Sequence, residues 1–97
     1  MADLINARKE QSLAEIRQWD FDFNNDLISG VTILSATSTH IPPSGAASTP
    51  IVGTIGSGIV PVKLGPLAVI GVHILSCLAA LSNGEKSELR VRITVSY

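Results

Sequence analysis

The amino-acid sequence predicts an all-β fold on three observations. Several short runs of β-branched and aliphatic residues follow one another along the 97 residues, and Gly, Pro, Asn and Ser separate them at near-regular spacing. Apolar and polar residues alternate strictly at the C-terminal end. Aromatic residues alternate with polar ones around residue 20. Short strands with turn residues between them are typical of a β-sandwich or a β-barrel.

The N-terminal part differs from the rest. Residues 1–15 are expected to form an arm, extended or partly helical, and residues 16–97 a single β domain. Asp3 could cap a helix in the arm. A helix near a chain terminus frays without a partner, so the arm is expected to become ordered against a neighbouring chain. The apolar residues with partial helical spacing, which are the candidate partner-binding residues, are Leu4, Ile5, Leu13 and Ile16.

Three of the four aromatic residues share one face of the first expected strand of the β domain. These core anchors are Trp19, Phe21 and Phe23. Residues 31–41 are rich in β-branched side chains and end at a Pro-Pro-Ser-Gly turn. Residues 51–55 and 59–64 are shorter β-prone runs on either side of a Gly-Ser-Gly segment. Pro50 and Pro61 place parts of these runs at edge or irregular positions.

The C-terminal third predicts a closing β-hairpin. Residues 72–81 are apolar on both faces, as expected of a central strand, and an Asn83-Gly84 pair follows them. Asn and Gly both tolerate the positive φ of a tight hairpin turn. Apolar and polar residues alternate with a period of two in the last strand, so one of its faces is expected to be buried and the other exposed to solvent. Its expected core residues are Leu89, Val91, Ile93 and Val95.

The charges are few and unevenly placed. The formal net charge is −1, from seven Lys and Arg against eight Asp and Glu, which gives no electrostatic reason to expect nucleic acid or an anionic membrane. Fourteen of the fifteen charges lie in residues 3–26 and 85–92, and Lys63 alone lies between them. A free small domain scatters charge over its surface. We therefore expect another chain to cover much of the middle segment, with a homo-oligomer favoured; a neutral Ser/Thr-rich β surface is the alternative.

Membrane insertion, secretion and disulfide bonding are not expected. Residues 66–81 are nearly all apolar, but these sixteen residues are shorter than the about 20 that a spanning helix needs. Charged residues stand near the N-terminus where a signal peptide has its apolar core. Cys77 is the single cysteine, so neither an internal disulfide nor a zinc cluster is possible.

Two segments carry residues that could form a site, and both favour structural roles. Residues 20–26 place oxygen ligands as in a calcium loop, but Asn25 stands where the loop needs Gly, and Val31 stands where it needs Glu. A turn is the simpler interpretation, although ion binding by this segment stays open. His73 and Cys77 would lie roughly 13 Å apart on a strand, at about 3.3 Å per residue, which is too far for a nucleophile pair.

The remaining candidates also favour structural roles. His40 stands alone beside the Pro-Pro turn with no second ligand in sequence reach. The glycines between residues 53 and 58 lack the Lys-Ser/Thr pair of a phosphate loop. Arg90 and Arg92 have Glu85 and Glu88 as neighbours, so cross-strand or partner contacts explain them better than phosphate binding. The chain is therefore expected to be non-enzymatic, with no catalytic residue, cofactor, metal or small-molecule substrate.

The order of the features resembles a known group of proteins. The segment WDFDFNNDLISGVTILSATST is followed by a neutral Gly/Ser/Thr-rich middle and then by GVHILSCLAALSNGEKSELRVRITV. This order resembles small Ig-like β-sandwich proteins of tailed-bacteriophage virions over roughly residues 19–97. The chain departs from that group in its more apolar penultimate strand and its charged arm. The resemblance implies an Ig-like or Greek-key sandwich of about six to eight short strands.

The same resemblance implies a virion structural protein, assembled in the host cytoplasm. A capsid decoration (cement) protein is expected, because burying apolar surface against the shell offsets a small core. Its partners would be the major capsid protein or other virion subunits. The alternatives are a neck or tail-fibre adaptor and a bacterial Ig-like binding module.

Overall fold

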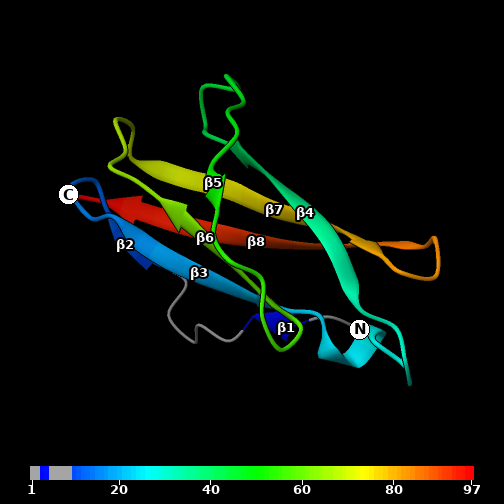
Figure 1. Cartoon of the computed structure of the whole chain (residues 1–97). Coiled ribbons are helices and arrows are strands. Elements are labelled where there is room, and N and C mark those ends of the chain that lie inside the picture. Colours follow the sequence, from blue (N-terminus) through cyan, green and yellow to red (C-terminus); the bar gives the residue numbers. More distant parts are fainter. Residues whose placement is uncertain (1–2, 5–9) are drawn as a thin grey trace.

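The chain folds into two four-stranded sheets that pack face to face (Figure 1). The computed structural model describes residues 3–4 and 10–97. In chain order the elements are β1 (Asp3–Leu4), β2 (Glu10–Ser12), β3 (Arg17–Asp22), the 3-10 helix η1 (Asn24–Asp26), β4 (Ile33–Ile41), β5 (Ile51–Val52), β6 (Ile59–Leu64), β7 (Gly71–Leu81) and β8 (Lys86–Ser96). Sheet A has the order β1-β3-β6-β5, and sheet B has the order β2-β8-β7-β4. The predicted all-β sandwich is confirmed.

Sheet A is built on the alternation of aromatic and polar residues in β3. Trp19 lies opposite Val62 and Phe21 opposite Val60 in the antiparallel pairing of β3 with β6. All four side chains are fully buried. Aromatic and β-branched side chains that face each other across two strands stabilise a sheet. This pairing therefore fixes the register of sheet A.

Sheet B is dominated by the β7–β8 hairpin. Its two strands are each 11 residues long and pair from Gly71 opposite Val95 to Ala80 opposite Lys86. Gly84 adopts a φ of +88° in the turn, which is the conformation expected of the Asn-Gly pair. β7 lies between β8 and β4, as expected for a central strand.

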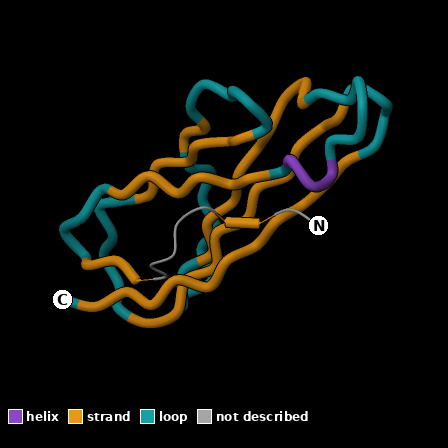
Figure 2. The backbone as a smooth tube through the Cα atoms, turned by 90° about the horizontal axis from the view of Figure 1, so that it is seen from below, coloured by secondary structure: helices purple, strands orange, loops and turns teal. Residues whose placement is uncertain are grey.

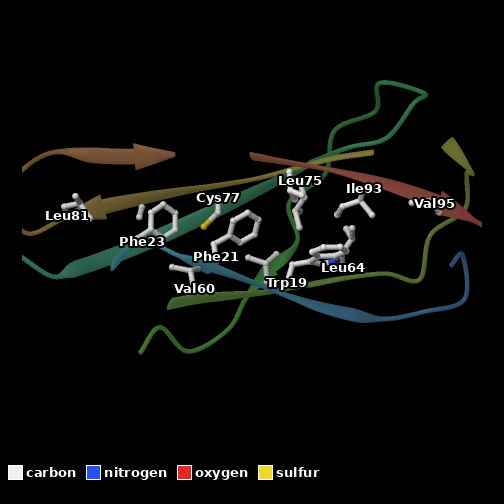
Figure 3. Close-up of a cluster of buried hydrophobic side chains, with 13 residues drawn as sticks. Trp19, Phe21, Phe23, Val60, Leu64, Leu75, Cys77, Leu81, Ile93 and Val95 are labelled. Atoms are coloured by element: carbon white, nitrogen blue, oxygen red, sulfur yellow. The ribbon is translucent and has the colours of Figure 1, made fainter. Parts of the chain in front are cut away.

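The core lies between the two sheets and runs along the sandwich (Figure 3). Among the predicted core residues, Leu89 is half-buried and packs against the cluster, and the others are buried. The cluster comprises Trp19, Phe21, Phe23, Val60, Val62, Leu64, Leu75, Cys77, Ala79, Leu81, Val91, Ile93 and Val95.

The expected arm is corrected in its C-terminal part. Residues 10–15 contain no helix, and β2 pairs in parallel with β8, with Gln11 opposite Val95. The Gln11 side chain is buried, so β2 belongs to the sandwich. The physical reason is the open edge of β8, whose backbone groups need partners that β2 supplies.

The four candidate partner-binding residues of the arm separate in the structure. Leu13 is half-buried and packs against the core, whereas Ile16 is 65% exposed. The backbone of Leu4 lies in β1, opposite Phe21. Ile5 lies outside the described residues.

The sandwich is elongated, with extents of 43 × 24 × 21 Å. Viewed from below, the strands run along the long axis and most loops gather at the two ends (Figure 2). Within residues 3–4 and 10–97, no helix is long and apolar enough to cross a membrane.

Candidate functional site

A pocket opens at the end of the sandwich where β4 finishes and β7 begins. Its volume is about 760 Å³. Residues 42–50, the loop that projects at the top of Figure 1, and residues 65–69 contribute to its walls. The lining residues are Ile16, His40, Pro42, Ser44, Ser48, Thr49, Pro50, Ile51, Lys63, Leu64, Gly65, Pro66, Leu67, Ala68, Val69 and His73.

Two histidines from neighbouring strands meet in this pocket. His40 lies opposite Leu75 in the pairing of β4 with β7, so His73 is the diagonal neighbour two residues away on the same face. Both side chains point between the sheets and are buried, with exposed fractions of 8% for His40 and 1% for His73. A diagonal neighbour lies within reach of a ring side chain.

The two imidazoles belong to a chain of hydrogen bonds with a defined direction. His73 Nε2 lies 2.7 Å from the carbonyl oxygen of Val69, which only accepts, so Nε2 carries the proton. Nδ1 of neutral His73 is then the acceptor for His40 Nε2–H, 2.7 Å away. His40 Nδ1 in turn accepts from the Ser48 hydroxyl at 3.2 Å. Every polar atom of both rings therefore has a partner.

The ring geometry shows that the bond is close to linear. The ring planes lie within 2° of parallel, and their centroids are 5.0 Å apart. In a five-membered ring with bonds of about 1.35 Å, each nitrogen lies about 1.15 Å from the centroid. If the two nitrogens lie on the line between the ring centres, the centroid separation equals the N···N distance plus one centroid-to-nitrogen length for each ring. The observed 5.0 Å and 2.7 Å agree with this arrangement. The rings therefore meet edge to edge along the hydrogen bond and do not overlap face to face.

This geometry does not fit a metal ion between the rings. An ion bound to both nitrogens along this line would hold them about 4 Å apart, because each metal–nitrogen bond is about 2.0 Å. His40 Nε2 and His73 Nδ1 are 2.7 Å apart. No group of three His, Cys, Asp or Glu side chains suited to a metal occurs within the described part of the chain. The two rings are therefore joined by the hydrogen bond from His40 Nε2–H to His73 Nδ1.

Burial keeps His40 neutral. Desolvation lowers the pKa of His40 below its ordinary value of 6.5, and the neighbouring His73 lowers it further because two positive imidazoles would repel each other. Near pH 7 His40 is therefore uncharged. Of the pocket-lining residues that the structure describes, Lys63 is the one with a formal charge.

Ser48, His40 and His73 superficially match a nucleophile, a base and an orienting group. Acyl transfer also needs backbone N–H groups free to stabilise an oxyanion. The N–H of Ser48 is not free, because it donates to the carbonyl oxygen of His40 at 2.9 Å, and the N–H of His40 donates to the carbonyl of Ser48. These residues form a cross-strand pair whose side chains meet on one face.

The other sequence candidates take structural positions. Cys77 is fully buried in the core beside Phe21 and Phe23 (Figure 3), and burial raises its pKa to about 12. In the acidic segment, Asp22 Oδ1 accepts hydrogen bonds from the backbone and side-chain nitrogens of Asn24. This closes a turn at η1, as the sequence indicates.

The His40–His73 contact is the feature that the sequence analysis missed. In the sequence His40 stands alone, because His73 is 33 positions away. Both histidines lie at inward-facing positions in the in–out alternation of their strands, β4 and β7. The sequence could indicate their contact only if the register of β4 on β7 were already known.

Comparisons with known proteins give the fold and no family. No family model and no curated protein matches the chain. A solved structure similar to it is that of CopC from Methylosinus trichosporium OB3b, with a TM-score of 0.61 and 14% identity. The match covers 99% of this chain and 94% of that chain. At this identity the likeness establishes the sandwich fold alone.

The predicted function, a phage capsid decoration protein or a neck or tail adaptor, is corrected. The similarity to CopC, a solved structure that matches nearly the whole chain, points away from a capsid role. The physical reason is that the motifs behind the prediction specify strands and turns, which unrelated sandwiches share. The virion localisation and the capsid partner depend on the same resemblance and stay predictions.

Proposed function

We propose that this protein is a non-catalytic binding protein, and that its pocket takes a small molecule with an apolar body and one carboxylate. The observation that carries the proposal is the lining of the pocket: largely apolar walls, a few converging polar groups and one cation. Ligand pockets typically combine apolar walls with a few placed polar groups. This proposal departs from the sequence-based expectation of no small-molecule ligand.

The apolar part of the ligand would contact the walls. Leu64 and Leu67 are buried or half-buried there, and Ile51 and Val69 are exposed. Exposed aliphatic side chains around a concavity lose contact with water when a ligand fills it. The apolar walls therefore favour an aliphatic chain over a sugar or a nucleotide.

The polar groups select an acid. Lys63 supplies the positive charge, and Ser44, Ser48 and Thr49 supply hydroxyl donors. Among the described residues that line the pocket there is no Asp or Glu to repel a carboxylate. A bound carboxylate would also stabilise the protonated form of His40, so binding is expected to be accompanied by proton uptake at slightly acid pH.

The test is isothermal titration of the native chain with octanoate and, separately, with 1-octanol. Octanoate is expected to bind once per chain and more tightly than the alcohol. Lys63→Gln should weaken octanoate binding by about 1.4- to fivefold, the range for an exposed ion pair, and leave binding of the alcohol unchanged. Lys86→Gln, which removes an exposed charge at the start of β8, is the matched control and should change neither.

A second variant tests the location. Ala68 is exposed and lines the pocket, so Ala68→Trp fills space without disturbing the core. It should abolish octanoate binding while circular dichroism remains unchanged. If octanoate fails to bind the native chain, or binds Ala68→Trp as well as native, the proposal is wrong.

A further inference from the structure

The hydrogen bonds of the histidine pair leave one ring nitrogen within reach of the pocket. His73 Nε2–H donates to the Val69 carbonyl oxygen, and His73 Nδ1 accepts from His40 Nε2–H. The remaining lone pair is that of His40 Nδ1, which accepts from the Ser48 hydroxyl. Ser48 is exposed and lines the pocket, whereas His73 is 1% exposed. A proton that enters the pair from solvent therefore adds to His40 Nδ1.

This protonation reverses the hydrogen bond between His40 and Ser48. A serine hydroxyl has one hydrogen and two lone pairs. While His40 is neutral, the hydroxyl hydrogen is directed to Nδ1, 3.2 Å away, so Ser48 offers the pocket only lone pairs. A protonated Nδ1 becomes the donor, the Ser48 oxygen becomes its acceptor, and the hydroxyl hydrogen is free to turn toward the pocket. Solvent supplies the proton and one N–H bond forms, and no covalent bond breaks.

We propose that Ser48 is a specificity-determining residue of the pocket, and that a proton on His40 Nδ1 turns its hydroxyl from an acceptor into a donor toward the ligand. This inference rests on the proposed function, because it concerns the same pocket and the same class of ligand. A carboxylate only accepts hydrogen bonds, so the lone pairs of Ser48 offer it none while His40 is neutral. After protonation Ser48 donates to the carboxylate, and the imidazolium charge behind the hydroxyl strengthens that bond. The pocket is therefore expected to hold the acid more tightly at slightly acid pH.

The titratable groups around His40 are compatible with this exchange. His73 on β7 keeps its single proton on Nε2, and Lys63 on β6 lines the same pocket. Residues 42–50 and 65–69, which complete the walls, contain no titratable side chain. Burial and the neighbouring His73 lower the pKa of His40 in the free chain. A carboxylate attracts both Lys63 and a protonated His40, so the proton is taken up chiefly together with the acid.

The test is isothermal titration of the full chain with octanoate at about pH 7.5 and about pH 6, where a carboxylate remains ionised. The native chain is expected to bind octanoate about two- to fivefold more tightly at the lower pH, as part of the advantage of a charge-assisted hydrogen bond over a neutral one. 1-Octanol can both donate and accept a hydrogen bond, so it is expected to bind equally at the two pH values.

Two substitutions of nearly equal shape isolate the hydroxyl. Ser48→Val leaves a protonated His40 Nδ1 without an acceptor and should remove the pH effect on octanoate binding. Ser48→Thr keeps the hydroxyl and should retain the effect. Both new side chains are β-branched, and the two bonds that pair residue 48 with His40 are made by the backbone, so neither variant removes them.

Nitrogen NMR of the imidazole rings supplies a second readout. In the octanoate complex at about pH 6 the added proton should reside on His40 Nδ1. Equal octanoate affinity at the two pH values, a pH effect that survives in Ser48→Val, or an added proton on His73 would each overturn this inference while the proposed function stands. Absence of octanoate binding at both pH values would overturn the proposed function, and this inference with it.

Discussion

The indole Nε1–H of Trp19 donates a hydrogen bond to Oε1 of Gln11, 3.0 Å away, and both side chains are fully buried. Gln11 lies in β2 of sheet B and Trp19 in β3 of sheet A. The Gln11 amide nitrogen also donates to the carbonyl oxygens of Leu64 at 2.8 Å and Glu15 at 3.0 Å. One amide side chain thus joins the two sheets from within.

Gln11→Leu should destabilise the fold. The substitution leaves the Trp19 indole N–H and the Leu64 carbonyl without their partner, and each unsatisfied buried polar group costs about 1–3 kcal/mol. Urea denaturation should show the free energy of unfolding reduced by at least the about 1–3 kcal/mol of one such group. Gln18→Leu, at an exposed position of β3, is the matched control and should change it by less than about 0.5 kcal/mol. Equal effects of the two substitutions would contradict the bridging role of Gln11.

Gly65→Ala should be more destabilising than Gly45→Ala. Both glycines have positive φ, +120° and +84°, so both substitutions strain the backbone. A Cβ at Gly65 would also collide with the Glu15 carbonyl oxygen, whereas nothing lies within 4 Å of one at Gly45. The difference between the two variants isolates this collision, and we expect about 1–3 kcal/mol in the free energy of unfolding. Similar thermal midpoints for the two variants would argue against it.

The stability of the fold should fall as the pH drops below about 6.5. The pKa of His40 is lowered in the folded state, so the unfolded chain takes up this proton first. Stability from this source is complete above 6.5, the ordinary value, and decreases as the pH falls toward the folded pKa. Urea denaturation between about pH 7.5 and about pH 5.5 measures the slope. His40→Gln should flatten it, and an unchanged slope in that variant would assign the effect to other groups.

Cys77 should be unreactive in the folded protein. The thiolate is the reactive form, and burial raises the pKa of this thiol to about 12. At about pH 8 a thiol reagent such as DTNB should label the native chain only as fast as it unfolds, and at once in guanidinium chloride. Thr94→Cys supplies an exposed thiol and should react immediately in the folded state. Rapid labelling of native Cys77 would mean that the core opens at this position.

Much of the fold was predictable from local patterns. The alternation at Trp19, Phe21 and Phe23 and the Asn83-Gly84 pair indicated a strand and a hairpin, because period-two burial and turn chemistry are local properties. The parallel pairing of β2 with β8 was not predictable. It depends on an edge that exists only after β7 and β8 have paired, so a propensity for residues 10–12 cannot reveal it.

The candidate site was predictable only in its components. His40 and His73 were visible as isolated residues beside turns or on an apolar run, but their contact depends on strand order. The pocket has the same origin, because β4, β6 and the loops beside them meet only in the folded chain. The stretch of residues 27–84, in which Lys63 is the one charge, comprises β4, β5, β6 and β7, and its coverage by another chain stays a prediction.

The parallel arrangement of β2 and β8 also determines how the sandwich responds to tension. Glu10 lies opposite Thr94, Ser12 lies opposite Ser96, and the N–H of Leu13 extends the ladder to the Ser96 carbonyl at 2.9 Å. A force that pulls the start of β2 and the end of β8 in opposite directions slides the two strands past each other along their length. Their hydrogen bonds then carry the load together, whereas an antiparallel pair pulled from its open end would unzip one bond at a time. This short ladder is therefore a shear clamp between the start of β2 and the end of β8.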